Sequence, residues 1–256
     1  MTERFERTKM LIGDEALKIL QKSRIAVFGA GGVGGYAIEA LARSGIGALD
    51  IIDADTVNAT NLNRQIIASQ STVGRLKTEV FEERIKDIAP GTVVRRYDLF
   101  YLPEKRAGIP FAEYDYIIDA VDTVAAKLDI IEAAYELGIP VISAMGCGNR
   151  LDPSKLQICD ISKTSGDPLA KIIRKALRDK GIKKLDVVFS TELPVKPQMP
   201  ETAEISTGDG IATENELPKA SGRRSTPSSM VFVPACAGLM MASHVVRKLT
   251  EGSGQA

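Results

Sequence analysis

A glycine-rich turn near the start of the chain is followed by charged side chains that could bind and split a nucleoside triphosphate. The turn, G-A-G-G-V-G, spans residues 29–34 between an apolar run at 24–28 and a helical stretch at 33–43. A turn of this kind places backbone N–H groups and a helix N-terminus beside a phosphate. Its glycines are Gly29, Gly31, Gly32 and Gly34, and the charged residues that follow are Asp53, Arg64, Lys77 and Asp122.

The first of these charged residues fits more than one nucleotide. Asp53 comes 19 residues after Gly34, where a dinucleotide-binding fold uses a carboxylate to bind the ribose hydroxyls. ATP carries the same ribose, so Asp53 alone does not distinguish NAD from ATP. An oxidoreductase would also need a proton donor or acceptor beside the hydride, and the only histidine, His244, belongs to a C-terminal helical stretch.

The residues downstream of Asp53 favour ATP. Attack on the α-phosphate of ATP expels pyrophosphate and places negative charge on phosphate oxygens, which positioned cations stabilise. Arg64 offers a planar fork and Lys77 a point charge, while Asp122, just after an apolar run, could hold a Mg²⁺ ion bound to the phosphates. Taken singly, the two cations are typical of solvated charges and Asp122 of a helix N-cap. As a spaced set, they favour adenylation.

Strands and helices that alternate along the chain must position these residues. We expect strands at 24–28, 48–53, 93–97, 116–121 and 141–143, and helices within 1–22 and at 33–43, 71–88 and 123–137. Continuous apolar strands in such an alternation indicate a parallel sheet covered by helices on both faces. The sequence therefore predicts an α/β fold, Rossmann-like and doubly wound, with a mostly parallel sheet.

The pattern changes after residue 150. We expect an ATP-binding adenylation domain at 1–150 and a smaller C-terminal α/β extension at 151–256. Within this extension, the sequence predicts strands at 157–161 and 185–189, helices at 169–179 and 231–248, and a mobile loop at 191–229, where prolines and glycines are frequent.

Composition limits the classes of function. Basic and acidic residues balance at 33 each, so no overall field draws the chain to nucleic acid, and an RNA partner would need a local patch. The N-terminus is charged with no apolar stretch behind it, so we expect no signal peptide, no membrane span and a cytoplasmic location. The few scattered cysteines, Cys147, Cys159 and Cys236, argue against a disulfide framework and a four-cysteine zinc site.

Several motifs in the first 150 residues resemble those of one enzyme family. They are the glycine turn, Asp53-Ala-Asp-Thr-Val57, Asn61-Leu-Asn-Arg-Gln65, Lys77 and Asp119-Ala-Val-Asp122. The chain is similar to the ThiF/MoeB group, adenylating enzymes related to those that activate ubiquitin-like modifiers. The resemblance implies that Asp53, Arg64, Lys77 and Asp122 bind the ribose, phosphates and Mg²⁺ of ATP, with Asn61 at the nucleotide. Asp55 belongs to the same expected nucleotide-binding set.

The family also implies a homodimer. In this group an arginine near the N-terminus reaches into the site of the partner subunit, and Arg7 is the candidate here.

Further motifs extend the resemblance to one branch, the tRNA threonylcarbamoyladenosine dehydratases. They include residues 4–8, 42–47, 152–153, 167–170, 188–190 and 232–234. This branch implies that ATP activates the carboxylate of a modified adenosine beside the anticodon of tRNA, and that expulsion of AMP closes a ring, with net loss of water. The nucleophile of that closure belongs to the substrate.

Two other functions stay open. The chain could adenylate the C-terminus of a ubiquitin-like sulfur-carrier protein, with a sulfur-transfer partner, although relatives of that kind usually carry two Cys-x-x-Cys pairs that are absent here. It could also bind ATP without turnover, against which the intact charged set argues. No cysteine lies in residues 220–222, where some dehydratases carry one, and Cys147 is interpreted as a small residue packed beside glycines.

One helical stretch could contact tRNA. Its basic residues are Lys171, Arg174, Lys175, Arg178, Lys180, Lys183 and Lys184, and Asp179 is the only acid among them. With Arg223 and Arg224 they could form a phosphate-binding patch. The alternative is an ordinary solvated helix face.

Overall fold

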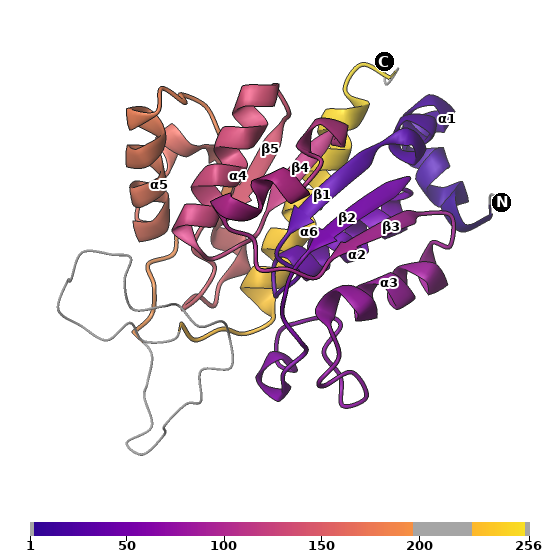
Figure 1. Cartoon of the computed structure of the whole chain (residues 1–256), viewed down its shortest axis with the longest axis horizontal. Helices are drawn as coiled ribbons and strands as arrows, with labels where there is room; N and C mark the ends of the chain where they lie inside the picture. The colour runs from indigo at the N-terminus through magenta and orange to yellow at the C-terminus, as the bar shows by residue number, and fades with distance from the viewer. Residues whose placement is uncertain (1–2, 197–226, 254–256) are drawn as a thin grey trace.

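A computed structural model describes residues 3–196 and 227–253 (Figure 1). Most of the expected loop at 191–229 lies outside the described residues, as do Arg223, Arg224 and residues 220–222. The described chain is organised around a sheet of seven strands in the order β3-β2-β1-β4-β5-β7-β6.

Strands and helices alternate up to residue 150, as the sequence predicts. The strands are β1 (Arg24–Phe28), β2 (Ala48–Ile52), β3 (Val93–Tyr97), β4 (Tyr116–Asp119), β5 (Val141–Ala144), β6 (Leu156–Asp160) and β7 (Asp186–Ser190). The α-helices are α1 (Glu6–Lys22), α2 (Gly34–Ser44), α3 (Lys77–Ile88), α4 (Val124–Leu137), α5 (Pro168–Asp179) and α6 (Phe232–Thr250). Short 3₁₀ turns include η1 (Glu3–Phe5) and η2 (Ala59–Asn61).

The strand order reverses between β1 and β4. Both strands are parallel to each other and to their outer neighbours, and only β6 runs antiparallel, at the edge beside β7. Open α/β sheets bind ligands at the carboxyl ends of the strands, at the point where the order reverses. The glycine turn follows β1 and Asp122 follows β4, so the topology brings both to this point. The predicted fold class is confirmed.

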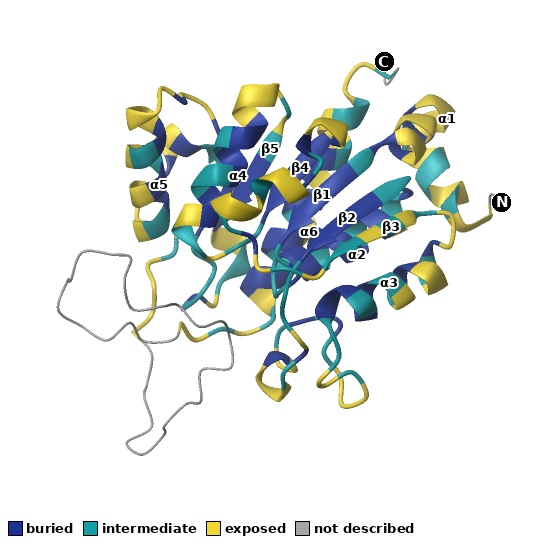
Figure 2. Ribbon diagram, in the orientation of Figure 1, coloured by how far each residue is buried: buried dark blue, intermediate teal, exposed yellow. Residues whose placement is uncertain are grey.

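Alternate side chains of each strand build two cores. Ile25 and Val27 of β1 face a cluster formed with α1, α2, α3 and α6, whereas Ala26 and Phe28 face the cluster beneath α4. A third cluster joins α5 to β7 on the same side as α4. Figure 2 shows the central strands buried between these layers and the outer faces of the helices exposed. Because helices cover both faces of the sheet, a ligand can reach it only at its edges, which include the ends of the strands.

The C-terminal helix packs directly on the helix that follows the glycine turn. A Cβ added at Gly238 of α6 would lie 2.2 Å from the backbone oxygen of Val33, so only glycine permits this approach. Pro234, at the start of α6, lies beside Gly32. Residues after 150 therefore add β6 and β7 to the sheet. Their helix α6 also packs against the glycine turn. The domain division at residue 150 stays a prediction.

One expected helix begins later than the sequence pattern suggested. A helix was expected over 71–88, but α3 begins at Lys77. Gly74 has a φ of +89°, and its N–H donates to Val57 O at 2.8 Å, while Lys77 N donates to Asp55 O at 3.0 Å. These bonds to the chain after β2 are incompatible with a helix. They place Lys77 at the helix N-terminus, next to Asp55.

Candidate nucleotide-binding site

Two glycines of the turn are required by the backbone itself. Gly29 has a φ of +87°, and a Cβ there would lie 2.7 Å from Ala120 O. A Cβ at Gly34 would lie 1.8 Å from Gly29 O. Such distances exclude any side chain, so these glycines let the chain turn sharply from β1 into α2 while touching the end of β4.

The other two glycines keep the turn's surface open. A Cβ at Gly31 would meet only Gln65 Nε2, at 3.7 Å, and one at Gly32 would meet Pro234 at 3.4 Å. Because these are ordinary van der Waals contacts, an added methyl group at either position should not disturb the fold. Because glycine has no side chain, a phosphate group can approach the backbone closely at these two positions.

Asp53 connects the turn to the chain after β2. One carboxylate oxygen accepts from Ala30 N at 2.6 Å and the other from Asp55 N at 2.8 Å. Burial raises the pKa of Asp53, and the charge of Lys77 opposes this rise. The carboxylate is thus fixed at the carboxyl edge and keeps lone pairs that could accept from ribose hydroxyls.

Lys77 and Asp55 form an ion pair at this edge. Lys77 Nζ lies 2.6 Å from Asp55 Oδ2, and the lysine side chain is only 3% exposed whereas the aspartate is 36% exposed. A buried ammonium with one carboxylate partner is a strong point charge held in place. Asp55, expected at the nucleotide, is therefore the immediate partner of Lys77.

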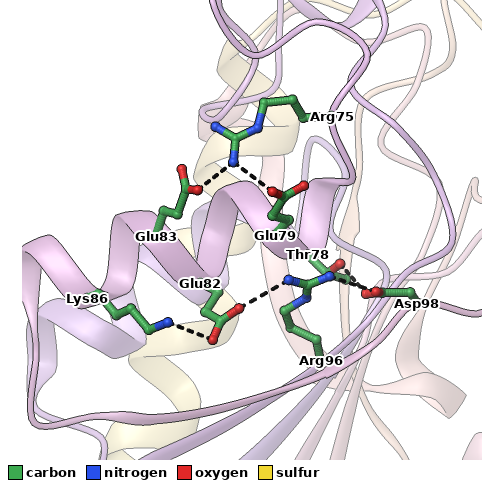
Figure 3. Close-up of polar contacts among 8 residues, drawn as sticks. All are labelled: Arg75, Thr78, Glu79, Glu82, Glu83, Lys86, Arg96 and Asp98. Carbon is green, nitrogen blue, oxygen red and sulfur yellow. Dashed lines mark hydrogen bonds and ion pairs between the residues drawn. The ribbon is translucent and has the colours of Figure 1, made fainter.

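Polar contacts on both sides of Lys77 fix the start of α3 (Figure 3). Arg75 donates to Glu79 and Glu83 of the helix. Thr78 Oγ1 donates to Asp98, which follows β3. Arg96 also donates to Asp98 and, with Glu82 and Lys86, extends this second network, which is separate from that of Arg75. These tethers leave the lysine backbone little freedom to move along the sheet edge.

Asn61 and Arg64 lie on the segment between β2 and α3. Asn61 is fully buried, and its Oδ1 accepts from Asn58 N at 3.0 Å. Its Nδ2 has no hydrogen-bond partner among the described residues, and buried donors of this kind normally find one. Arg64 Nη1 donates to Thr60 O at 2.9 Å, and the side-chain stem passes Gly32. Arg64 therefore lies beside the glycine turn, and Asn61 keeps a buried donor on the same segment.

Asp122 follows β4 and is exposed. The N-cap of α4 is Thr123, without a side-chain capping bond, so the alternative interpretation of Asp122 as the N-cap is wrong. Just below it lies a buried pair that the sequence reasoning missed: Lys127 Nζ is 2.8 Å from Asp119 Oδ2, and both side chains are 0% exposed. Asp119 also accepts from Val121 N at 3.2 Å, which fixes the turn that carries Asp122. Asp119 ends a strand and Lys127 belongs to the helix that follows it, so no short sequence window links the two.

A second missed pair lies after β5. Arg150 Nη2 is 3.3 Å from Asp167 Oδ2, both buried, and Asp167 also accepts from Gly146 N and caps α5 through Ala170 N. Cys147 lies in the same turn. Burial raises the pKa of its thiol to about 12, so the thiol is protonated at neutral pH. This agrees with the interpretation of Cys147 as a packed small residue.

The comparisons with known proteins decide the family. The ThiF family matches residues 5–255. The chain belongs to the ThiF family. The tRNA threonylcarbamoyladenosine dehydratase of Bacillus subtilis is 42% identical over 254 residues, covering 98% of this chain and 96% of the relative.

Solved structures of one such enzyme give the same result. The crystal structure of the Escherichia coli tRNA N6-threonylcarbamoyladenosine dehydratase with AMP has a TM-score of 0.84 at 36% identity and covers 99% of this chain and 96% of its own. The complex of that enzyme with ATP has a TM-score of 0.83 at 36% identity, covering 98% and 95%. The resemblance to the dehydratase branch is confirmed along the whole chain.

The ThiF chain brings most of its expected site residues to one edge of the sheet. The glycine turn, Asp53 and the Asp119–Asp122 turn directly follow three adjacent parallel strands, and Lys77 and Arg64 are tied to them by the contacts above. Arg7 is the exception. It is exposed on α1, just after Phe5, which lies beside Gly45 at the far end of α2. An 11-residue helix separates that end from the turn by about 16 Å.

A Mg²⁺ ion could be held here only together with phosphates. Among the described residues, no group of three or more His, Cys, Asp or Glu side chains could hold a metal. Mg²⁺ commonly binds one or two carboxylates, several waters and the phosphates of its nucleotide. The exposed Asp122 at the sheet edge fits that donor set as a single carboxylate ligand.

Proposed function

We propose that this protein is an ATP-dependent adenylating enzyme that dehydrates threonylcarbamoyladenosine in tRNA to its cyclic form. The proposal rests on the position of the site taken together with the relatives of the chain. A charged site for a triphosphate lies at the point where the strand order reverses, and the chain matches enzymes of this name over nearly its full length.

The reaction needs two displacements. An oxygen of the substrate carboxylate bonds to the α-phosphorus of ATP, and the bond to the leaving pyrophosphate breaks. A substrate nitrogen then attacks the activated carbonyl carbon and loses its proton, and AMP leaves with the carboxylate oxygen. In sum, the modified base loses water while ATP becomes AMP and pyrophosphate.

The residues of this chain act mainly in the first displacement. We assign Asp53 to the ribose hydroxyls and the open backbone at Gly31 and Gly32 to the phosphates. Lys77 and Arg64 supply positive charge where the phosphate oxygens gain negative charge, and preset cations stabilise such a transition state without reorganisation. The unsatisfied Nδ2 of Asn61 is a further donor toward the nucleotide.

We assign Mg²⁺ binding to Asp122, with the phosphates of ATP as its other ligands. Bound there, the ion would neutralise charge on the leaving pyrophosphate. Asp119 and Lys127 beneath it hold the turn in place. The expected set is thus divided into ribose, phosphate and metal roles, with Asp53 after β2, the glycine turn after β1, Asp122 after β4, and Lys77 and Arg64 on the segments beside them.

We propose a homodimer in which Arg7 reaches the site of the partner. Within one chain Arg7 lies at the wrong end of α2, so the position suits action across an interface. One turn further along α1, Met10 is 82% exposed and Leu11 75% exposed. Adjacent apolar side chains exposed on one helix are typical of a surface that a partner covers.

The exposed cations of α5 are the proposed tRNA contact. Lys171, Lys175 and Arg178 are exposed and follow one another on one face of the helix. Arg174 is different, since its guanidinium donates to Thr164 Oγ1 at 2.7 Å and to Thr164 O at 2.9 Å. Lys180 is paired with Glu132 at 2.8 Å. The described part of the expected set therefore divides into exposed cations that could meet phosphates, one lysine already in an ion pair, and one arginine that serves the fold.

The remaining expectations rest on the sequence. We propose a cytoplasmic location, where the tRNA substrate would be found. Within residues 3–196 and 227–253, no helix combines the length and apolarity needed to cross a membrane. A sulfur-transfer partner stays a prediction, and the three free cysteines, Cys147, Cys159 and Cys236, contain no Cys-x-x-Cys pair that would favour a sulfur-carrier substrate.

Pyrophosphate release tests the proposed function. Purified protein is incubated with ATP and either bulk tRNA from cells that carry the modified adenosine, a ubiquitin-like carrier protein, or neither. We expect release with the tRNA alone, lowered about 100-fold but still measurable in Arg64→Ala, and appearance of the cyclic nucleoside by mass spectrometry. Stimulation by the carrier protein but not by tRNA would refute the proposal.

A further inference from the structure

Arg64 is the first member of a hydrogen-bond chain that leads out of its own loop. Its Nη1 donates to Asn63 Oδ1 at 3.1 Å. The amide nitrogen of the same asparagine, Nδ2, donates to Ser229 O at 2.8 Å, across 166 positions of sequence. The two contacts fix the orientation of the Asn63 amide, because a guanidinium only donates and a carbonyl oxygen only accepts.

The next link joins this chain to the turn after β5. Asn149 Oδ1 accepts from both Ser228 N at 2.7 Å and Ser228 Oγ at 2.8 Å, and Asn149 N donates to Ser228 O at 2.7 Å. Asn149 has a φ of +59°, the only positive φ of a non-glycine residue in the described part of the chain. Asparagine tolerates this left-handed conformation better than most residues, so the turn presents its side chain to Ser228.

We infer that Asn63 and Asn149 are positioning residues for Arg64, an inference that rests on the proposed role of Arg64 at the ATP phosphates. The brace, defined here as Asn149, Ser228, Ser229 and Asn63, runs from the end of β5 to the loop after β2. Through it, the asparagine beside Arg64 is held by residues that lie outside its own loop.

The brace has a chemical consequence. An arginine on a surface loop has many rotamers, and only those that point at the phosphates help the displacement. The Asn63 contact removes part of this freedom. The segment that contains Ser228 and Ser229 continues into α6, which packs under the glycine turn. The brace and the glycine turn are therefore both supported by α6.

Four variants test the brace by the rate of tRNA-dependent pyrophosphate release. Asn63→Leu keeps the branched shape of the side chain but removes both amide contacts. Asn149→Gly keeps the positive φ but removes the acceptor for Ser228, whereas Asn149→Asp keeps both. Since misplacement of a catalytic group by about 1 Å can cost on the order of 100-fold, we expect kcat to fall about 10- to 100-fold in Asn63→Leu and about tenfold in Asn149→Gly. Asn149→Asp should recover most of the rate, and Arg64→Ala provides the reference.

Coupling to Arg64 separates positioning from a general effect on the fold. In an Arg64→Ala background, Asn63→Leu and Asn149→Gly should cause no further loss of kcat, because the group that they position is gone. Unchanged kcat in the single variants, or a further equal loss in the Arg64→Ala background at an unchanged melting temperature, would overturn the brace.

The Kd for ATP, measured by calorimetry, keeps the two hypotheses apart. If wild-type protein binds ATP but tRNA releases no pyrophosphate, the proposed function fails and the brace is judged by binding alone. The brace then predicts weaker ATP binding in Asn63→Leu and Asn149→Gly, again only when Arg64 is present. Equal Kd values in all chains that retain Arg64 would overturn it.

Discussion

Lys77 Nζ lies 2.6 Å from Asp55 Oδ2, and the lysine is almost completely buried while the aspartate reaches solvent. Sequence reasoning assigned both residues to the nucleotide, and the structure pairs them with each other. The carboxylate offsets part of the cost of burying the charge of the lysine. It therefore prepares the lysine for the negative charge that develops on the phosphates.

Removing the charge of Lys77 should stop the first displacement. Lys77→Met keeps much of the side-chain volume but removes the cation, so we expect kcat for pyrophosphate release to fall by about 100-fold or more. The matched control is Lys86→Met on the same helix, whose ammonium pairs with Glu82 at the surface. A Lys77→Met enzyme as active as the Lys86→Met control would contradict the assignment.

Two glycines of one turn should respond differently to alanine. Gly34→Ala would place a Cβ 1.8 Å from Gly29 O, and we expect the free energy of unfolding to fall by about 3 kcal/mol. Gly31→Ala meets nothing closer than 3.7 Å, so stability should change by less than about 0.5 kcal/mol. Its methyl group should instead raise the Kd for ATP. Chemical denaturation and calorimetry give the two quantities, and unchanged ATP affinity in Gly31→Ala would place the phosphates elsewhere.

The sequence was sufficient for the fold, and it indicated most of the residues that the structure brings to the carboxyl edge of the sheet, because its signals are local. A glycine turn after an apolar strand and an aspartate at the next strand end are read within short windows. The Asp119–Lys127 and Arg150–Asp167 pairs were missed because the two partners of each pair come from different segments of the chain. They become neighbours only in the folded protein. The start of α3 was missed for a similar reason, since backbone bonds to the Asp55–Val57 segment override the helical pattern before Lys77.

The thiol of Cys147 should react slowly and take no part in catalysis, although it lies near the candidate site. Burial raises the pKa of its thiol to about 12, and only the thiolate is nucleophilic. Alkylation by iodoacetamide, followed by mass spectrometry of the Cys147 peptide, should therefore be slow at pH 8 and accelerate about tenfold per pH unit above it. Cys147→Ala should retain kcat. Rapid labelling at pH 7, or loss of activity in a folded Cys147→Ala protein, would show that the thiol takes part in the reaction.

The α5 face should contribute to tRNA affinity through charge alone. Replacing Lys171, Lys175 and Arg178 by glutamine removes three exposed cations, so the slope of log Kd against log salt should fall by about 2 to 3. Lys105→Gln, an exposed lysine on the η3 turn (Pro103–Gly108), is the control. Arg174 is left intact because it stabilises the Thr164 loop. An unchanged salt dependence of tRNA binding would favour the ordinary solvated face.

Arg7 and Arg64 should complement each other between subunits. If Arg7 serves the partner's site, Arg7→Ala and Arg64→Ala homodimers both release pyrophosphate far more slowly than wild type. A chain that carries Arg7→Ala still offers Arg64, and its partner with Arg64→Ala still offers Arg7, so a mixed dimer contains one complete site. Equal mixing gives half mixed dimers, and activity should recover to about a quarter of wild type.

The complementation result depends on subunit exchange, so the mixture is unfolded and refolded together or co-expressed with two different tags. Met10→Lys provides a second measurement, because a charge at this exposed apolar position should weaken the interface and lower the apparent mass at low concentration. Recovery of activity with dimers present places Arg7 in the partner's site. Absence of recovery in verified mixed dimers would mean that Arg7 acts elsewhere, and full activity of Arg7→Ala alone would remove it from the mechanism.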